Sequence, residues 1–466
     1  MKKRIFIVAG LGYGDESKGS IVDWLSSVYP VKEIWRYNGG SQAAHNVVLE
    51  DGVNHCFAQF GSGLLEAPVL TGLSRFMAIN PINLMNEYEI LEKKLKFKMP
   101  PIYIDSQSPV ITPYHVLTNQ IRELSRGLDR RGTCGYGVGE TFKDAEKYPR
   151  QILRIGDLND INILKSKLKF WRALKIDEAE QLAGSSPTCL FWLGRIGVKL
   201  DSYFDFLLNF YSGFLGENNI HSFDNNFSFP EVCGDVVYEG AQGVLLHRDY
   251  GFFPHVTQSD TSFQNAEKLI AERKLEGEVF KIGVLRAYWT RHGAGPFVTE
   301  DESLKDIIPE EHNKENEWQG DFRLGWFDLV AARYALKIIG SVDGLALTNL
   351  DRLLNFKEIK VCVAYRYQGR YPQLVAKYFI CEPVASDNSV LITGIKKPLI
   401  NPRNFMRQIT CFLNSCEPVY ETIKVTSDFF NQYPKYLEEK LGVKIVLIST
   451  GPKASDKKVI GRLPLP

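Results

Sequence analysis

The sequence predicts an α/β fold with a large, mostly parallel central sheet covered by helices. Three observations support this prediction. An apolar run at 4–9 leads through a glycine-rich turn at 10–20 into a helical pattern that starts at Ile21. Several later apolar runs are continuous rather than alternating, which favours strands that are buried on both faces. Residues 326–339 have helical spacing and end at Gly340, a typical helix stop.

The expected elements follow one another without a linker rich in proline or serine, so we predict a single domain over 1–466. Residues 160–230 are rich in Leu, Phe, Lys and Asn, and we read them as a helical insertion with a polar loop at 216–226. The predicted strands are 4–9, 33–37, 235–239, 281–285, 344–348, 360–365 and 444–448.

The composition of the 466 residues excludes several classes of protein. Lys and Arg total 56 against 55 Asp and Glu, so no global field attracts nucleic acid or a membrane surface. Eight scattered cysteines without a Cys-x-x-Cys pair argue against a zinc site or a disulfide framework. No apolar window reaches the length of a spanning helix, and the basic N-terminus precedes too short an apolar run for a signal peptide. We therefore expect a cytoplasmic protein that binds neither nucleic acid nor membrane.

The turn at 10–20 carries the strongest chemical signal. Between a strand and a helix, backbone N–H groups and the positive helix end face an anion, and Lys18 can reach a phosphate. A carboxylate in such a loop would repel a phosphate, so Asp15 indicates a bound cation or acid–base chemistry. The order Ser17-Lys18-Gly19 is not a Walker A loop, and Asp15 stands where a dinucleotide fingerprint needs glycine. A tight turn with an exposed polar tip is the alternative.

Further clusters of small and polar residues follow other predicted strands, where open α/β sheets bind ligands. Such a loop at 39–46 ends near His45, which alone would suit a structural role equally well. Four glycines at 132–139 suit an anion-binding loop or a flexible surface loop. The tetrad at 348–351 resembles the base-reading segment of guanine-nucleotide sites. The remaining clusters are 239–246, 254–257, 290–297 and 449–452.

Taken in order, these clusters resemble the adenylosuccinate synthetase family. The first family loop, Trp-Gly-Asp-Glu-Gly-Lys-Gly-Lys-Ile-Val-Asp, corresponds to 13–23, with Ser17 in place of a glycine. The second, Gly-Gly-x-Asn-Ala-Gly-His-Thr, corresponds to 39–46. Later family motifs match Glu-Gly-Ala-Gln-Gly at 239–243 and Thr-Arg-x-Gly-x-Gly-Pro-Phe at 290–297. The resemblance runs from about residue 3 to 455, excluding 160–230, and implies a P-loop-like GTP-dependent ligase.

The resemblance implies that GTP and Mg²⁺ are used to join IMP to an amine, which is aspartate in the family. The γ-phosphate moves to the purine O6, and the amine then displaces it, because phosphate leaves more readily than hydroxide. Asp15 would take the purine N1 proton and bind Mg²⁺ together with the backbone of Ala44. His45 would stabilise the transferring phosphate, Lys18 would hold the GTP phosphates, and Gln242 would position the purine edge.

The resemblance also implies two nucleotide sites in a homodimer. Asp351 would read guanine, and Arg150 would reach the 5′-phosphate of the IMP-like nucleotide from the partner subunit. The GTP site would comprise Gly14, Glu16, Ser17, Lys18, Gly19, Asn349, Asp351, Ser449 and Gly451. The purine nucleotide site would comprise Gln42, Thr133, Cys134, Arg150, Gln242 and Thr257.

Departures from the family pattern leave three hypotheses open. A family threonine is Cys134, an asparagine is Gln42, and the lysine of the tetrad is Asn349. The family loop Thr-Thr-Gly-Arg-x-Arg-Arg, which grips aspartate, is replaced at 317–324 by a segment with one arginine and two carboxylates.

The first hypothesis is a ligase that uses an amine other than aspartate, which the altered 317–324 segment favours. The second is an ordinary adenylosuccinate synthetase that grips aspartate through Arg286 or Arg323. The third is a nucleotide-binding protein without catalysis, against which the intact Asp15, Lys18, His45 and Gln242 argue.

Overall fold

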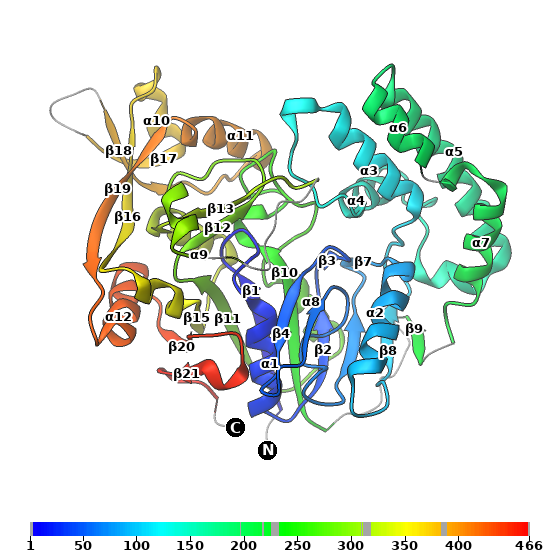
Figure 1. The fold of residues 1–466 in the computed structure, drawn as a ribbon, viewed down its shortest axis with the longest axis horizontal. Coiled ribbons are helices and arrows are strands. Elements are labelled where there is room, and N and C mark those ends of the chain that lie inside the picture. Colours follow the sequence, from blue (N-terminus) through cyan, green and yellow to red (C-terminus); the bar gives the residue numbers. More distant parts are fainter. Residues whose placement is uncertain are drawn as a thin grey trace.

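The fold has three regions, which Figure 1 shows from one side. The computed structural model describes residues 3–464, except 196, 217–218, 225–232, 309, 311–317 and 384–388. A central sheet lies between a group of helices on one side and a smaller, mostly antiparallel sheet on the other (Figure 1). Both ends of the described chain lie below the central sheet in this view.

The central sheet has ten strands within the described part of the chain, in the order β21-β20-β15-β11-β1-β10-β2-β6-β8-β9. All neighbouring strands are parallel except β20 and β21, which confirms the predicted α/β fold. The bounds are β1 (Arg4–Gly10), β2 (Val31–Arg36), β6 (Leu70–Leu73), β8 (Ile102–Asp105), β9 (Ile220–Phe223), β10 (Asp235–Gly243), β11 (Glu278–Arg286), β15 (Gly344–Thr348), β20 (Ile445–Ser449) and β21 (Lys457–Val459).

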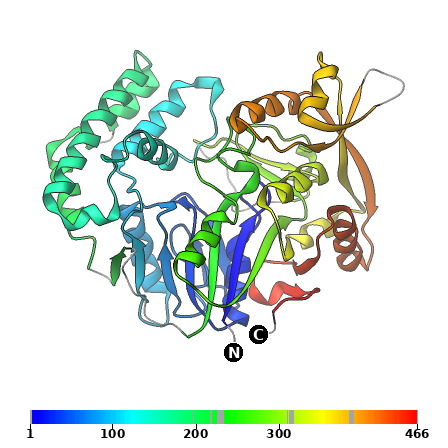
Figure 2. The ribbon, with the colours of Figure 1, turned by 180° about the vertical axis from the view of Figure 1, so that it is seen from behind.

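Strand β1 explains why the apolar runs are continuous. All seven of its residues are buried, and it pairs with β10 on one side and β11 on the other. Ile5 and Ile7 join one hydrophobic core, whereas Phe6 and Val8 join the core on the opposite face. Helices α1 (Lys18–Val28) and α2 (Pro81–Lys94) cover one face, and α8 (Gln264–Glu272) covers the other (Figures 1 and 2).

The predicted helix at 326–339 is confirmed with a shorter start. Helix α9 (Leu329–Ile339) ends before Gly340, whose φ of 92° suits glycine. It begins after Asp328 because that carboxylate accepts a hydrogen bond from the N–H of Ala331 at 3.0 Å and caps the helix. Helix α12 (Phe429–Leu441) packs against α9 and joins the same core.

The predicted strand at 360–365 exists but lies outside the central sheet. It is part of β16, which pairs antiparallel with β18 and β19. Exposed Glu358 and Lys360 alternate there with buried Ile359 and Val361, a pattern typical of a strand with one solvent face. This second sheet comprises β14 (Phe327–Asp328), β16 (Glu358–Tyr367), β17 (Phe379–Pro383), β18 (Val390–Ile395) and β19 (Cys416–Lys424), beside α10 (Pro372–Tyr378) and α11 (Pro402–Leu413).

The segment 160–230 is largely helical, as its composition predicts. It contains α5 (Ile161–Ala183), α6 (Pro187–Arg195) and α7 (Asp201–Ser212), which stand beside α3 (Pro113–Ser125) and α4 (Val138–Lys147). The predicted polar loop at 216–226 is partly wrong, because Ile220–Phe223 form β9 and extend the edge of the central sheet through pairing with β8. Residues 217–218 and 225–226 lie outside the described residues. The division into one domain with an insertion stays a prediction.

Short elements complete the fold around the sheet. The two-stranded pairs are β3 (Gly39–Gly40) with β7 (Met77–Ala78), β4 (His45–Val48) with β5 (Asn54–Phe57), and β12 (Trp289–His292) with β13 (Phe322–Gly325). The 3-10 turns are Gly127–Asp129, Ile155–Asn159, Gly197–Lys199, Val244–Leu246, Glu302–Asp306, Leu350–Asn355 and Ala454–Asp456.

The structure also bears on two features considered from the sequence, disulfides and membrane-spanning helices. All eight cysteines are described and free, so no disulfide joins them. Across the described residues, no helix combines the length and apolar character that crossing a membrane requires. The cytoplasmic location and the lack of nucleic-acid and membrane partners stay predictions.

Candidate active site

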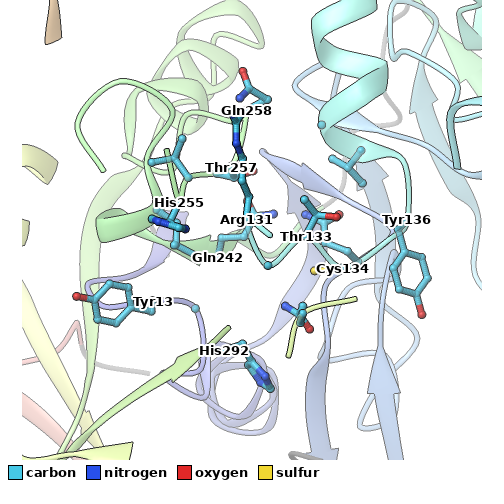
Figure 3. A pocket seen from close by; sticks show the side chains of 18 of the residues that line it. Tyr13, Arg131, Thr133, Cys134, Tyr136, Gln242, His255, Thr257, Gln258 and His292 are labelled. Carbon is cyan, nitrogen blue, oxygen red and sulfur yellow. The ribbon is translucent and has the colours of Figure 1, made fainter. Parts of the chain in front are cut away.

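A cavity of about 260 Å³ lies beyond the carboxyl ends of β1 and β10. Segments that are far apart in the sequence meet around it, and Figure 3 shows Gln242 and Thr257 near Thr133 and Cys134. Nine predicted site residues line it: Gly14, Asp15, Gln42, Ala44, His45, Thr133, Cys134, Gln242 and Thr257. The structure therefore brings together the residues predicted for catalysis and for the purine nucleotide, with the exception of Lys18 and Arg150.

Asp15 presents an unsatisfied oxygen to this cavity. Its Oδ2 atom is buried and has no hydrogen-bond partner within the described structure. The ring of His292 lies beside it, with Nε2 at 3.5 Å from Asp15 Oδ2. A buried carboxylate oxygen without a partner is costly, and such atoms mark positions where a ligand or ion is expected.

Burial keeps His45 a neutral imidazole, and a buried hydrogen-bond network fixes its ring. Its Nδ1 lies 2.5 Å from Oε1 of Glu239, which also accepts a hydrogen bond from the hydroxyl of Ser62. Burial, reinforced by the charge of Arg36, lowers the pKa of His45 to about 4. Although burial opposes it, Arg36 and the hydrogen bonds lower the pKa of Glu239 to about 2. Nδ1–H therefore donates to Glu239, and Nε2 is the nitrogen left for a ligand in the cavity.

Gln242 occupies a strained position at the end of β10. Its φ of 61° lies in the left-handed region, which a non-glycine residue adopts at a cost. Gly14, whose φ of 117° suits glycine, lies beside it, and an added Cβ there would be in ordinary contact with the Cα of Gln242 at 3.5 Å. The side-chain Oε1 of Gln242 is buried and has no partner among the described residues. The end of β10 and the turn at 10–20, which we call the phosphate loop, thus fix this amide at the cavity wall.

The glycine-rich loop at 132–139 supplies one hydroxyl and one thiol to the cavity. Asn119 donates a hydrogen bond of 3.0 Å to the Thr133 hydroxyl, which also accepts from the N–H of Gly135 at 3.3 Å. Burial, followed by the charge of Asp15, raises the pKa of the Cys134 thiol to about 12. Cys134 is therefore a neutral, weak hydrogen-bond donor where the family pattern has threonine.

Lys18 lies inside the phosphate loop rather than in the cavity. Its Nζ donates to the carbonyl of Gly14 at 2.7 Å and to Oε2 of Glu16 at 2.8 Å. The other carboxylate oxygen of Glu16 accepts from the N–H of Gly14 at 2.6 Å. The buried Lys18–Glu16 pair closes the loop on itself, so the reach of Lys18 to a phosphate stays a prediction.

The residues predicted to read guanine lie outside the cavity, next to the phosphate loop. Asn349 is joined to Ser17 by a side-chain hydrogen bond of 3.0 Å. Burial raises the pKa of Asp351, which is two residues further along the 3-10 turn Leu350–Asn355. Ser449 donates to the carbonyl of Gly451 at 3.0 Å at the end of β20. Glu16 and Gly19, the other predicted members of this group, belong to the phosphate loop and the first turn of α1.

Arg150 lies apart from the cavity within a single chain. It is an exposed residue that follows the end of α4, and it does not line the cavity. Its predicted contact with the purine nucleotide therefore requires another subunit, as the resemblance implies.

Arg323 of the segment that replaces the aspartate-gripping loop, and Arg286 of β11, are both already engaged. Arg323 forms a two-pronged ion pair with Glu300, with 2.7 Å from Nε to Oε1, and its Nη1 donates to the carbonyl of Gly295 at 2.9 Å. Arg286 pairs with Glu310 and donates to the hydroxyl of Tyr288 at 2.6 Å. Each guanidinium thus already has a carboxylate partner, and the Nε of Arg286, which has no partner among the described residues, is buried.

The same segment covers the glycine-rich loop. An added Cβ at Gly135, whose φ is 74°, would lie only 2.8 Å from the Trp318 ring, so glycine allows the indole to sit on this loop. Trp318 also packs edge-on against Trp192 of α6, with 5.1 Å between ring centroids. Gln319 follows and lines the cavity. Glu317, predicted to add negative charge here, lies outside the described residues.

Several cavity residues were not singled out from the sequence. His292 and His255 sit within quoted motifs, and Arg131 stands directly before the glycine-rich loop. Burial, followed by the charge of Arg291, lowers the pKa of His255 to about 4. The signal for these residues was their place inside strand-end loops, but nothing in the sequence indicates which loop residues face inward.

Comparison with known proteins agrees with this geometry. The family model for adenylosuccinate synthetase matches residues 7–458. The chain is 31% identical to the adenylosuccinate synthetase of Vibrio cholerae and 30% identical to that of Aquifex aeolicus, and each alignment covers 97% of this chain and 96% of the relative.

Two solved structures share the fold. One is the fully ligated adenylosuccinate synthetase of Plasmodium falciparum, with 22% identity and a TM-score of 0.69, covering 98% of this chain and 99% of that one. The other is the succinoaminodeoxyadenylate synthetase of cyanophage S-2L bound to dGMP and to dATP as an energy donor. It has 14% identity and a TM-score of 0.57, and the match covers 98% of this chain and 96% of that one. From the full-length match and the relatives, the chain belongs to the adenylosuccinate synthetase family and is a ligase that forms carbon–nitrogen bonds.

Proposed function

We propose that this chain is a GTP-dependent ligase that phosphorylates O6 of an IMP-like nucleotide and replaces it with an amine other than aspartate. The observation that carries the proposal is the meeting of Asp15, His45 and Gln242 at one cavity. A carboxylate, an imidazole and a fixed amide are groups that suit this reaction.

The geometry supports a role for each group. The free Oδ2 of Asp15 would accept the purine N1 proton, which makes O6 a nucleophile towards the γ-phosphate. With Glu239 fixing the ring, His45 would take up a proton when the negative phosphate binds, and its Nε2–H would then donate a hydrogen bond to the transferring phosphate. Gln242 would hold the purine edge through its side-chain N–H, which can donate a hydrogen bond to O6. The amine would then add at C6, and phosphate would leave with the O6 oxygen.

The residues present fit a magnesium ion. The carboxylate of Asp15 has a second oxygen, Oδ1, which is a hard ligand distinct from the oxygen assigned to the N1 proton, and the backbone of Ala44 lines the same cavity. The described residues contain no cluster of three or more acidic, His or Cys side chains that could hold a metal alone. We propose that Asp15, the carbonyl of Ala44 and substrate phosphates hold Mg²⁺ together. When bound, it neutralises charge on the phosphates.

GTP is the proposed phosphate donor because of Asp351. A carboxylate accepts hydrogen bonds from guanine N1–H and N2–H, whereas it faces a lone pair on adenine N1. Ser449 and Gly451 would flank the base, and the amides of the phosphate loop would hold the phosphates together with Lys18.

The engaged arginines support an amine other than aspartate. A dicarboxylate needs charge-assisted donors on each carboxylate, and the loss of one such partner costs about 2–5 kcal/mol. Here Arg323 forms an ion pair with Glu300, and Arg286 forms one with Glu310. Asp321 adds an exposed negative charge to the segment 317–324. These contacts favour a donor with fewer negative charges.

A second candidate, ordinary use of aspartate, is favoured by one observation. Arg131 lines the cavity and forms no ion pair with a carboxylate in the parts of the chain that the structure describes. It could supply a carboxylate grip from outside the altered segment. A second contact with the aspartate carboxylates would require the altered segment 317–324 to rearrange when aspartate binds.

The two candidates are separated by identifying the product. The protein is incubated with IMP, GTP, Mg²⁺ and single amino acids or amines, and new purine products are identified by mass. We expect a product with another amine and little adenylosuccinate. Efficient adenylosuccinate formation at micromolar aspartate would establish the second candidate. Absence of any product and of GTP hydrolysis with every amine would refute the ligase.

A homodimer with a shared site is part of the proposal. The exposed position of Arg150, away from the cavity of its own chain, supports its delivery to the nucleotide 5′-phosphate of the partner subunit. Gln42, Thr133, Cys134 and Thr257 would complete that phosphate site from within the chain.

A further inference from the structure

Two departures from the family pattern contact each other. Ser17 stands where the family loop has glycine, and Asn349 stands where the family tetrad has lysine. The hydroxyl of Ser17 donates to Oδ1 of Asn349 at 3.0 Å, although 332 positions separate them in the sequence. The contact joins the phosphate loop to the segment proposed to read the base.

The backbone at both residues is unusual. Ser17 has φ of 65° and Asn349 has φ of 58°, so both lie in the left-handed region. Glycine adopts this region without penalty, asparagine tolerates it, and serine does so at a cost. Ser17 makes no side-chain cap bond to α1, so its hydroxyl is directed to Asn349 rather than to its own helix. Retained strain of this kind is typical of positions with a role in function.

Two neighbouring contacts reinforce the same junction. Thr348 donates through its hydroxyl to the carbonyl of Glu16 at 3.0 Å. Ser20 donates to the carbonyl of Pro452 at 3.2 Å, beside the segment 449–452 that ends β20. The loop that carries Asp15 is therefore bonded on both sides to the segments that would surround the base.

We propose that the Ser17–Asn349 hydrogen bond is a latch that makes catalysis depend on correct reading of the donor base. Asp351 follows Asn349 by two residues, and Asp15 precedes Ser17 by two. A base that pairs fully with Asp351 holds Asn349 in place and, through Ser17, holds the loop of Asp15 in its reactive position. Ser17 and Asn349 are positioning residues, and the proposal rests on the ligase function proposed above.

The latch predicts an effect on kcat as well as on KM. Inosine triphosphate keeps the N1–H of guanine but lacks the N2 amino group, so it satisfies Asp351 only in part. We expect the wild-type kcat with this nucleotide to be at least fivefold lower than with GTP. A contact that contributed only to folding or to binding would leave the two kcat values equal at saturation.

The test uses Ser17→Gly, Asn349→Gly and the double variant. Glycine suits a positive φ at both positions, so these changes remove the side chains without straining the backbone. Asn401→Gly is the matched control, because Asn401 also has a left-handed backbone, with φ of 48°, and begins α11 outside the cavity. For each variant, kcat and KM are measured with GTP and with inosine triphosphate, and melting temperatures are recorded.

We expect the kcat ratio between the two nucleotides to fall below twofold in each single variant. The double variant should show no further fall, because either change opens the latch. Asn401→Gly should keep the wild-type ratio. Equal kcat values in the wild-type protein, an unchanged ratio in the single variants, or additive effects in the double variant would each overturn the latch.

Failure of the latch is distinguishable from failure of the proposed function. Product formation with unchanged ratios would refute the latch alone. Absence of product and of GTP hydrolysis in the wild-type protein would refute the ligase function, and the latch, which acts on catalysis, would fall with it.

Discussion

Nε2 of His292 lies 3.5 Å from Oδ2 of Asp15, where β12 brings a ring nitrogen to the carboxylate of the phosphate loop. The imidazole also packs against Phe322, its register partner on β13, with 4.7 Å between ring centroids. The ring is thus held on one side by an aromatic residue and faces the proposed base on the other.

Asp15→Asn should abolish product formation while leaving nucleotide binding intact. The amide preserves the loop but cannot accept the N1 proton, and a general base contributes about 10²–10⁴-fold to the rate. Product formation and calorimetric binding of GTP are measured. Asp129→Asn, the same change at an exposed carboxylate outside the cavity, is the control. Near-normal rates in Asp15→Asn would show that another group is the base.

His292→Leu should lower kcat about tenfold, which corresponds to about 1.4 kcal/mol, the scale of one hydrogen bond. Leucine keeps the apolar contact with Phe322 but leaves Asp15 without its neighbouring ring nitrogen. His292→Gln retains an N–H donor and should recover most of the loss. Steady-state kinetics test this, and equal kcat values for both variants and the wild-type protein would contradict it.

Asp351→Ala should reduce the preference for GTP over ATP. The carboxylate supplies two acceptors to guanine, and each lost hydrogen bond to a charged group is worth about 1.5–3 kcal/mol, so the ratio of kcat/KM values should fall at least tenfold. Asp343→Asn changes a carboxylate before β15 and serves as a control for general damage. Equal use of ATP and GTP by the wild-type protein would remove the basis for this assignment.

Mixing Arg150→Ala with Asp15→Asn should restore activity that neither variant has alone. In a dimer with shared sites, a mixed pair contains one site with both residues intact, so random exchange should recover about a quarter of wild-type activity. The assay follows product formation after mixing, and light scattering reports the mass in solution. A monomer, or a mixture no more active than its components, would refute the shared site.

Asp23 makes the stability of the fold depend on pH. Burial, followed by the charge of Glu66, raises the pKa of Asp23 from its ordinary value of 3.8 to about 8 in the folded chain. For an acid whose folded pKa is raised, unfolding releases a proton more readily as pH increases, so stability falls between about pH 4 and pH 8.

Asp23→Asn should remove this contribution to the pH dependence of stability. Its melting temperature should match the wild-type value near pH 4 and exceed it by a few degrees at pH 8. Melting curves across this range are the measurement. A lower melting temperature than wild type at pH 8 would show that the charged form of Asp23 is needed in the fold.

The fold could be predicted from the sequence where a local residue pattern reflects how the element is buried in the folded chain. The continuous apolar residues of β1 predict a buried strand because both of its faces are covered. The strand at 220–223 could not be predicted, because its short polar sequence pairs only through the edge that β8 offers. Similarly, the apolar run in β16 gave no indication of the sheet to which it belongs.

For the site, predictions were confined to residues whose chemistry was recognisable in a motif. The structure gathers nine of them at the cavity, among them Asp15 and Gln242, although their roles stay predictions. Pairings such as Lys18 with Glu16 and Arg323 with Glu300 depend on side-chain geometry that no spacing rule specifies. His292 was missed for the same reason, since only the β12–β13 pairing turns it towards Asp15.

The contact between Trp192 and Trp318 places a surface helix in touch with the wall of the cavity. Trp318 in turn rests on Gly135 and precedes Gln319, which faces the cavity. Substitutions on α6 can therefore reshape the cavity wall without altering Asp15, His45 or the phosphate loop. An enzyme arranged in this way can acquire a new amine substrate through changes in its peripheral helices while the phosphorylation chemistry stays the same.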